Sequence, residues 1–327
     1  MAITIWNGST GDWGTGANWS TSSVPVSADD VIFDGRTAQA VTTGLDQTGV
    51  DLASMHIMST YTVDIGTQAN PLTIETNGTL RVEGTGNIFM MCGNDAADAD
   101  IVTTIVNQAS GTFKIHSQKN ASGQNISAWT DLFIQKGRVT AYGNADTEPT
   151  PAADAGCWIK NLYIVPAQGS GANVTMTIGD KCKDLKNSDS ISIFMQAGTV
   201  TMDSKIKLLH LHGGTFTVGS DTYTMLGTDD ALTDLYLYGG DFNWRPSDKA
   251  VKASPSPVIT TARIFSGNFD ASAMLETDST APTITTVDLY DGGVFNIKNG
   301  FANFIVTTLN NYGGQISVSQ GQALTLT

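Results

Sequence analysis

The sequence predicts an all-β protein, a parallel β-helix solenoid of about ten coils. A short unit recurs in which alternating apolar residues flank a glycine pair, as around Gly213-Gly214 and Gly239-Gly240. These units are evenly spaced along much of the chain. The polar residues are mostly Thr, Ser, Asn, Asp and Gly, which favour strands and turns over helices. Together these features indicate short strands that stack coil upon coil.

The glycines that anchor the repeated unit define the length of a coil. Successive anchors from Gly214 to Gly293 are 26, 27 and 26 residues apart. Positions +2 and +4 after each glycine are mostly apolar, as in Phe216/Val218, and positions +1 and +3 are mostly polar, which predicts strands with one buried face. The anchors are Gly78, Gly111, Gly137, Gly171, Gly198, Gly214, Gly240, Gly267, Gly293 and Gly314.

Other intervals between anchors depart from this period. Gly78–Gly111 and Gly137–Gly171 are longer and predict a coil with an inserted loop, whereas Gly198–Gly214 and Gly293–Gly314 are shortened coils. The alternative is a β-sandwich or barrel, in which strands follow every 8–12 residues or so without a longer period.

Residues 1–34 differ from residues 35–327, which form the predicted β-helix domain. Trp6, Trp13 and Trp19 lie among short glycine- and asparagine-rich turns. Large rings on polar turns indicate a compact cap that covers an otherwise exposed end of a core. We therefore expect an N-terminal Trp-rich cap.

Composition excludes several classes of function. The formal net charge is −14, which argues against nucleic-acid binding, because such binding depends on basic side chains that neutralise phosphates. No apolar stretch is long enough to cross a bilayer, and residues 1–14 lack a basic, then apolar, signal peptide. Cys92, Cys157 and Cys182 share no metal-ligand spacing, which is typical of isolated thiols in a reducing cytoplasm.

No catalytic, cofactor-binding or metal-binding residue is assigned from the sequence. His210 and His212 would face one side of a strand, but no third metal ligand has a suitable spacing. Acids from neighbouring coils can serve polysaccharide hydrolysis. The candidate catalytic acids are Asp241, Asp270 and Asp291. They occupy different positions in their repeated units, so they are out of register with one another. An aromatic platform for sugars would use Tyr236, Tyr238 and Tyr290, although tyrosines are common on the wet face of a strand.

The N-terminal residues resemble a motif, W…G.W….NW….P…DD.(V/I).F, that opens many bacterial and phage β-helical surface proteins. The matching residues are Trp6, Gly11, Trp13, Asn18, Trp19, Pro25, Asp29, Asp30 and Phe33. The resemblance covers this motif and the overall repeat plan. It indicates a structural virion protein of a tailed phage, similar to capsid-stabilising (decoration, or cement) proteins with a tail-spike-like β-helix.

This resemblance implies a non-enzymatic protein made in the host cytoplasm and placed on the outer capsid surface. Its implied partners are the major capsid protein, whose capsomers it bridges, and two further copies in a homotrimer of right-handed helices. The residues implied in the cap or in docking are Trp6, Trp13, Asn18, Trp19 and Pro25. Whether these residues contact a partner or only close the core stays open.

Two other functions stay open as well. One is a tail-spike or head-fibre type protein that binds a receptor or degrades polysaccharide, with a host surface glycan as its partner. The chain leaves little room for it, because the cap and coils take up nearly all 327 residues. The other is a cell-surface adhesin, which would require export.

Overall fold

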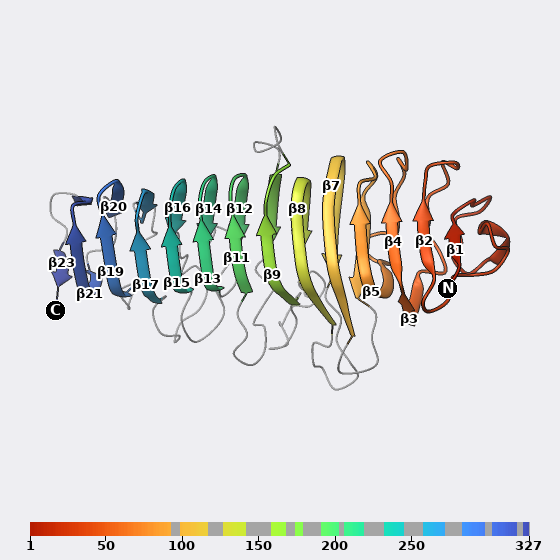
Figure 1. The fold of residues 1–327 in the computed structure, drawn as a ribbon, viewed down its shortest axis with the longest axis horizontal. Coiled ribbons are helices and arrows are strands. Elements are labelled where there is room, and N and C mark those ends of the chain that lie inside the picture. Colours follow the sequence, from red (N-terminus) through yellow and green to blue (C-terminus); the bar gives the residue numbers. More distant parts are fainter. Residues whose placement is uncertain are drawn as a thin grey trace. The chain divides into compact units, whose positions relative to one another are not determined.

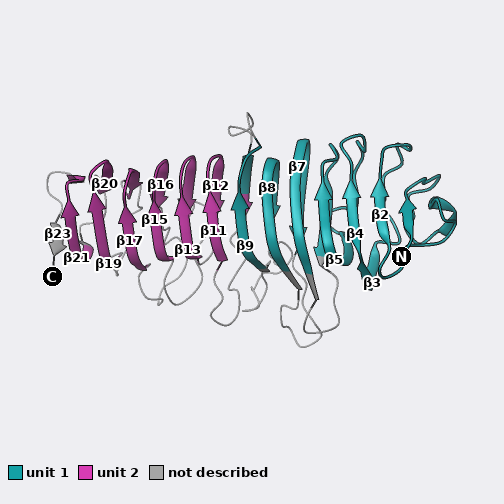
Figure 2. Ribbon diagram, viewed as in Figure 1, with its two compact units in different colours: residues 1–176 teal, residues 177–327 magenta. Residues whose placement is uncertain are grey.

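The computed structural model describes residues 1–92, 99–116, 127–141, 158–167, 174–178, 191–202, 206–218, 232–244, 258–271, 283–297, 303–318 and 323–326. In these ranges the chain is all-β, and its one helical element is the short 3-10 turn η1 (Gly16–Asn18). The chain forms two compact units, residues 1–176 and 177–327 (Figure 2). Gly171, Cys157, Cys182 and the side chain of Cys92 lie outside the described part.

The first unit is a parallel β-solenoid. One ladder of parallel strands runs through β1, β2, β4, β5, β7, β8 and β9. The longest strands, β5, β7 and β8, extend into a second ladder, in which β5 pairs with β3 and β6, β7 pairs with β6, and β8 pairs with β7. The strands are β1 (Ile3–Ile5), β2 (Asp30–Phe33), β3 (Asp46–Leu52), β4 (Ser54–Ile57), β5 (Leu72–Val82), β6 (Ile88–Cys92), β7 (Ala99–His116), β8 (Ser127–Ala141) and β9 (Trp158–Ile164).

The second unit contains two parallel ladders. Figure 1 shows the arrows of the front ladder pointing the same way, coil after coil. The first ladder is β11 (Ile191–Met195), β13 (Ile206–Leu211), β15 (Leu232–Leu237), β17 (Val258–Ile264), β19 (Thr283–Tyr290), β21 (Asn303–Tyr312) and β23 (Ala323–Leu326). The second is β12 (Thr199–Met202), β14 (Thr215–Val218), β16 (Asp241–Trp244), β18 (Gly267–Asp270), β20 (Gly293–Ile297) and β22 (Gln315–Val318). Strand β10 (Val174–Ile178) contains the boundary between the units.

The strand register confirms the predicted solenoid. Phe216 pairs with Phe242, Phe242 with Phe269 and Phe269 with Phe295, which are intervals of 26 (242 − 216), 27 (269 − 242) and 26 (295 − 269) residues. The shortened intervals recur too, at 16 residues from β12 to β14 (216 − 200) and 21 from β20 to β22 (316 − 295). A sandwich or barrel would not give this continuous parallel pairing.

The core consists of side chains that stack in columns along the coils. The rings of Phe216, Phe242, Phe269 and Phe295 are fully buried, and neighbouring centroids lie 6.2, 5.1 and 5.1 Å apart. Burial of one such side chain contributes about 2 kcal/mol to folding. The predicted +2 and +4 positions are buried in every described coil except the last, where Ile316 and Val318 are 37% and 39% exposed.

One anchoring glycine belongs to a different corner from the one predicted. Leu80, two residues after Gly78, pairs with Met55 and Thr104 in the first ladder. Phe113, two residues after Gly111, instead pairs with Ile88 of β6. The coil before Gly111 therefore starts at Gly86, and the interval is 25 residues (111 − 86) rather than a longer coil with an inserted loop.

Stacked glycines form the corner between the two ladders of the second unit. Gly240 has φ +80°, and a Cβ atom there would lie 2.4 Å from the carbonyl oxygen of Gly214. A Cβ atom on Gly267 would lie 2.5 Å from the carbonyl oxygen of Gly240. Only glycine allows both this backbone conformation and this close approach. In the next two coils the positive φ lies at Gly292 and Gly313, one residue before the predicted anchors.

Candidate functional site: the N-terminal cap and the outer faces of the coils

The three N-terminal tryptophans form a buried aromatic cluster. Trp6, Trp13 and Trp19 are 1, 0 and 2% exposed. The Trp19 ring lies edge-on to the other two, with centroids 4.9 Å from Trp6 and 4.7 Å from Trp13, and all three surround Phe33 at 5.9–6.0 Å. Tyr61 packs against Phe33 at 5.1 Å. The cluster supports the predicted cap, and its indole rings are not surface contacts.

The other two predicted residues of the cap are also buried. Asn18 is 0% exposed, and its side-chain amide donates to the backbone oxygen of Asp12 at 2.7 Å and to the hydroxyl of Thr10 at 2.8 Å. Its side-chain oxygen accepts hydrogen bonds from the backbone N–H groups of Ser9 and Thr10. Pro25 is buried too. Asn18 thus fixes the turn that carries two of the tryptophans.

Strand β1 joins this cap to the solenoid. Ile3, Thr4 and Ile5 pair in parallel with Asp30, Val31 and Ile32 of β2. The 1–34 segment therefore contributes two rungs to the first ladder. The boundary predicted at residues 34 and 35 stays a prediction.

A group of exposed apolar side chains belongs to residues 1–34. Met1, Ile3 and Val26 are 90, 63 and 60% exposed, and we call them the N-terminal patch. The carboxylate of Asp29, itself only 7% exposed, accepts hydrogen bonds from the backbone N–H groups of Ala2 at 2.7 Å and Val26 at 3.1 Å. One buried carboxylate therefore holds the two segments of the patch together. The sequence motif contains Asp29 but gives no sign of this role.

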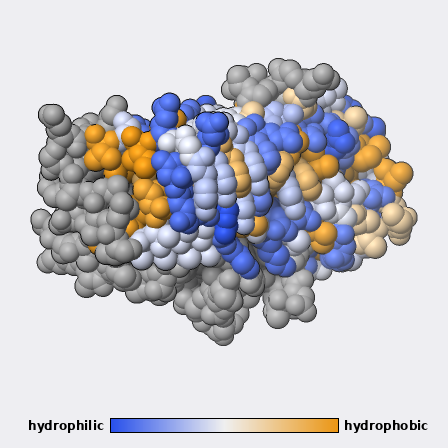
Figure 3. Space-filling model, turned by 60° about the vertical axis from the view of Figure 1, so that its left-hand side comes forward, coloured by the Kyte–Doolittle hydropathy of each residue, from blue (hydrophilic) through white to orange (hydrophobic). Residues whose placement is uncertain are grey.

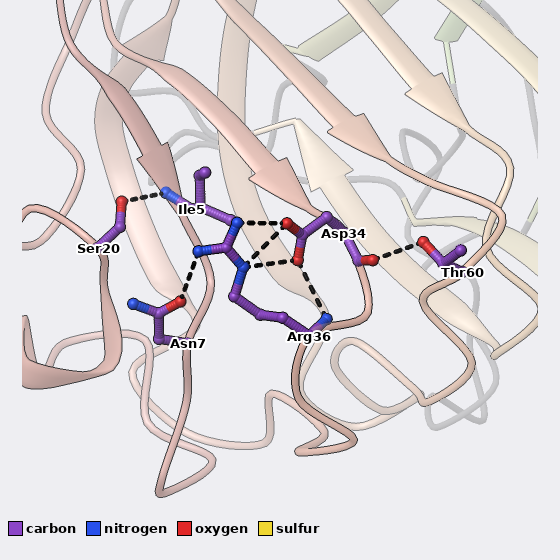
Figure 4. Close-up of polar contacts among 6 residues, drawn as sticks. All are labelled: Ile5, Asn7, Ser20, Asp34, Arg36 and Thr60. Atoms are coloured by element: carbon purple, nitrogen blue, oxygen red, sulfur yellow. Dashed lines mark hydrogen bonds and ion pairs between the residues drawn. The ribbon is translucent and has the colours of Figure 1, made fainter.

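An ion pair fixes the loop after β2 (Figure 4). The Arg36 guanidinium donates to the Asp34 carboxylate from Nη2 at 2.6 Å and to Asn7 Oδ1 at 3.3 Å. The hydrogen bond from Arg36 is the main cause of a lowered pKa of the Asp34 carboxyl. The Thr60 hydroxyl donates to the backbone oxygen of Asp34, so consecutive coils are tied together at the surface. Ser20 likewise holds the outer edge of β1 by accepting from the Ile5 N–H at 2.9 Å.

A column of stacked rings follows the outer face of the second unit. It consists of one ring per coil, placed just before the glycine corner, and we call it the ring column. Neighbouring centroids from His212 onward are 4.6, 5.0, 4.7 and 5.0 Å apart, with interplanar angles of 4–22°. Its members are His212, Tyr238, Phe265, Tyr290 and Tyr312, and Phe194, which pairs with His210, packs against His212 at 4.9 Å with a tilt of 46°.

This stacking argues against a sugar platform on the predicted tyrosines. Tyr238 and Tyr290 each lie between two rings of the column, which cover both of their faces. Tyr236 stacks on His210 at 4.7 Å, and the guanidinium of Arg263 lies 4.9 Å from its ring centroid. The rings stabilise the stacking of coils, and a sugar would meet mostly their edges.

The two candidate histidines are ring-stacked side chains. His210 stacks on Tyr236 and His212 on Tyr238. Burial, and secondly the nearby charge of His212, lower the pKa of His210. Among the residues that the structure describes, no group of three or more His, Cys, Asp or Glu side chains is placed to hold a metal ion.

The candidate acids are out of register, as the sequence predicts. Asp241 pairs with Asn268, and Asp270 pairs with Asn243, so the two acids are offset by two positions on neighbouring strands. Asp291 lies in the turn after β19. A polar row runs beside the ring column, in which Arg263 bonds to Asp234 at 3.3 Å. These outer side chains connect one coil to the next.

Comparison with known proteins gives no relative. No family model, no curated protein and no solved structure matches the chain. No helix within the described ranges is long and apolar enough to cross a membrane.

Proposed function

We propose that this protein is a structural virion protein, a decoration or cement protein that binds the outside of a phage head. The N-terminal patch is the observation that carries the proposal. Three large apolar side chains are 60–90% exposed on a backbone that a buried carboxylate fixes. Clustered exposed apolar residues on a rigid backbone are typical of a docking surface.

The docking surface in this proposal differs from the one that the motif implied. The indole rings of Trp6, Trp13 and Trp19 fill the core of the cap. Their role is to hold β1 and the turn before Pro25, and the patch contacts the major capsid protein. Residues 1–34 thus supply both the support and the contact.

Bridging of capsomers follows from several weak contacts acting together. A patch of three side chains is too small for a stable interface, since specific interfaces bury about 800 Å² on each partner. The proposed homotrimer carries three patches, and linked contacts bind far more tightly than one. The trimer, the right-handed winding and the count of about ten coils are parts of this proposal. The net charge of −14 suits an outer position, away from packaged nucleic acid.

The test is binding of the purified protein to phage heads that lack it, measured by co-sedimentation. Val26→Lys places a charge in the patch on a side chain that is 60% exposed. We expect the variant to bind at least about tenfold more weakly, equivalent to about 1.4 kcal/mol. Ser59→Lys places the same charge on an exposed side chain in the turn after β4, outside the patch, and serves as the matched control.

Two results would count against this function. Equal binding of Val26→Lys and the control would remove the patch as the docking surface. If the unmodified protein failed to bind heads, the decoration role itself would be wrong. Shortening of host surface polysaccharide by the purified protein would instead favour the spike function.

A further inference from the structure

The last described coil leaves core positions uncovered. Ile316 and Val318 of β22 pair with Phe295 and Ile297 of β20, which are 0 and 2% exposed. Ile316 and Val318 are themselves 37 and 39% exposed, although they occupy the same columns of the core. Figure 3 turns this side of the second unit toward the viewer and shows a group of apolar residues there. Within the described ranges, no further strand covers these two side chains.

The backbone of this coil is also open on one side. In the described ranges β22 pairs only with β20, and β21 pairs with β23 only through residues 303–306. The rest of β21 has a described partner on one side, β19. We call residues 307–312 and Gln315–Val318 the C-terminal edge. Unpaired N–H and C=O groups on such an edge are a template for another strand.

Charge is absent from this edge, which makes it unusual within the chain. Residues 299–327 contain no Asp, Glu, Lys, Arg or His in 29 positions (327 − 299 + 1). The whole chain carries 48 charged side chains (17 + 31), and no other uncharged stretch is as long. Proteins usually protect open edge strands with charged side chains that prevent pairing. The C-terminal edge has no such protection.

One corner of the coil is closed by a polar residue. Asn311 occupies the position that Leu289 fills one coil earlier. Its side chain accepts a hydrogen bond from the Gly313 N–H at 3.0 Å and donates to the Gly314 carbonyl at 3.3 Å. The exposed large apolar side chains described in this coil are therefore Tyr312, Ile316 and Val318.

We propose that the C-terminal edge binds the same edge of a second copy of this chain. Two copies with a net charge of −14 each repel one another wherever acidic surfaces meet, and this edge is where they approach without such repulsion. A partner of opposite charge would be recognised through acidic side chains, which this edge lacks. A two-fold axis places each β22 antiparallel to its copy, which satisfies both backbones and buries Ile316 and Val318.

The experiment compares molecular mass in solution by sedimentation velocity. We expect the unmodified protein to have twice the mass of Val318→Lys, because a charge that points into the core edge prevents pairing. Val26→Lys, the same substitution in the first unit, keeps the unmodified mass. The ratio of two holds whether the unit that pairs is one 34.5 kDa chain or the proposed trimer.

A second variant covers the case in which Val318→Lys does not fold. Gln315→Lys places the charge on the exposed side of β22 without entering the core, and it too halves the mass. Hydrogen exchange adds a local readout, because amides of residues 307–318 exchange more slowly as protein concentration rises. Equal masses for the unmodified protein and both edge variants would overturn the proposal, as would halving by Val26→Lys.

This inference does not rest on the capsid role. Failure of Val26→Lys to weaken head binding leaves the mass ratio unaffected. Failure of Val318→Lys to change the mass leaves the head-binding result unaffected.

Discussion

The imidazole of His210 lies flat on the phenol ring of Tyr236, with centroids 4.7 Å apart and 2° between the ring planes. This pair lies on the outer face of the coils, where side chains of successive strands stack in register. Outer side chains of the second unit thus reinforce the same stacking that the buried columns produce. The stack also carries a titratable group, which leads to the first prediction.

Stability should fall as pH decreases below about 6.5, the ordinary pKa of histidine. Burial and the charge of His212 lower the pKa of His210, so folding disfavours its protonated form. The contribution of neutral His210 is complete above the unfolded pKa and is lost as pH falls through the folded pKa. His210→Phe keeps a ring on Tyr236 and removes this loss. Denaturant unfolding at pH 7.5 and 5.5 tests it, and a pH-independent difference between the two proteins would contradict it.

Alanine substitutions at Gly49 and Gly240 should separate two costs in stability: the cost of a positive φ and the cost of a close contact with the neighbouring coil. Gly240 and Gly49 both have φ +80°, but only at Gly240 would a Cβ atom meet a backbone oxygen, at 2.4 Å. Gly49→Ala should cost about 1 kcal/mol through the positive φ alone. Gly240→Ala should cost clearly more, because the next coil must also move. Thermal and denaturant unfolding measure both, and equal losses would show that the stacked corner is not tight.

The tryptophan cluster should respond differently to two equivalent changes. The indole N–H of Trp19 donates to the Trp13 carbonyl at 2.8 Å, whereas the buried indole N–H of Trp13 has no acceptor among the described residues. Both Trp→Phe changes remove similar volume. Trp19→Phe should cost about 1 kcal/mol more than Trp13→Phe, because only it loses a hydrogen bond. A larger loss for Trp13→Phe, measured by denaturant unfolding, would contradict the assignment.

The Asp29 carboxylate should control the order of the N-terminal patch. Asp29→Asn keeps the shape but replaces one acceptor oxygen with a donor, so one of the two backbone bonds to Ala2 and Val26 is lost. We expect faster hydrogen exchange in both segments and weaker binding to heads. Asp30→Asn is the control, because that carboxylate accepts only from the Ser54 hydroxyl among the hydrogen bonds described, at 2.5 Å. Equal exchange in the two variants would argue against the tether.

Much of the fold could be predicted because the solenoid repeats its pattern. Phe242 and Phe269 are buried where the interval from one glycine to the next places them. The prediction that Gly78 and Gly111 occupy the same corner of successive coils was wrong. Both strands of a coil alternate with period two, so alternation alone does not show which ladder a strand joins. The ring column had a usable signal, since an aromatic or histidine ring lies shortly before each glycine corner from Gly214 onward, as at Tyr238 and Tyr290.

The candidate site was less accessible to sequence reasoning. Trp residues suit both an interface and a core, and only the folded structure places Trp6, Trp13 and Trp19 inside the cap. The role of Asp29 depends on contacts with Ala2, 27 residues away in the sequence, and no local pattern reports such contacts. The uncharged stretch from residue 299 onward was visible, but its meaning depends on knowing that β22 forms an open edge.

The number of copies of this protein in purified virions tests the central proposal most directly. Quantitative mass spectrometry against the major shell protein measures it. A decoration protein that bridges capsomers should be present in numbers comparable to the shell protein. A handful of copies per particle, or none, would contradict the decoration role, and a handful would instead favour a spike.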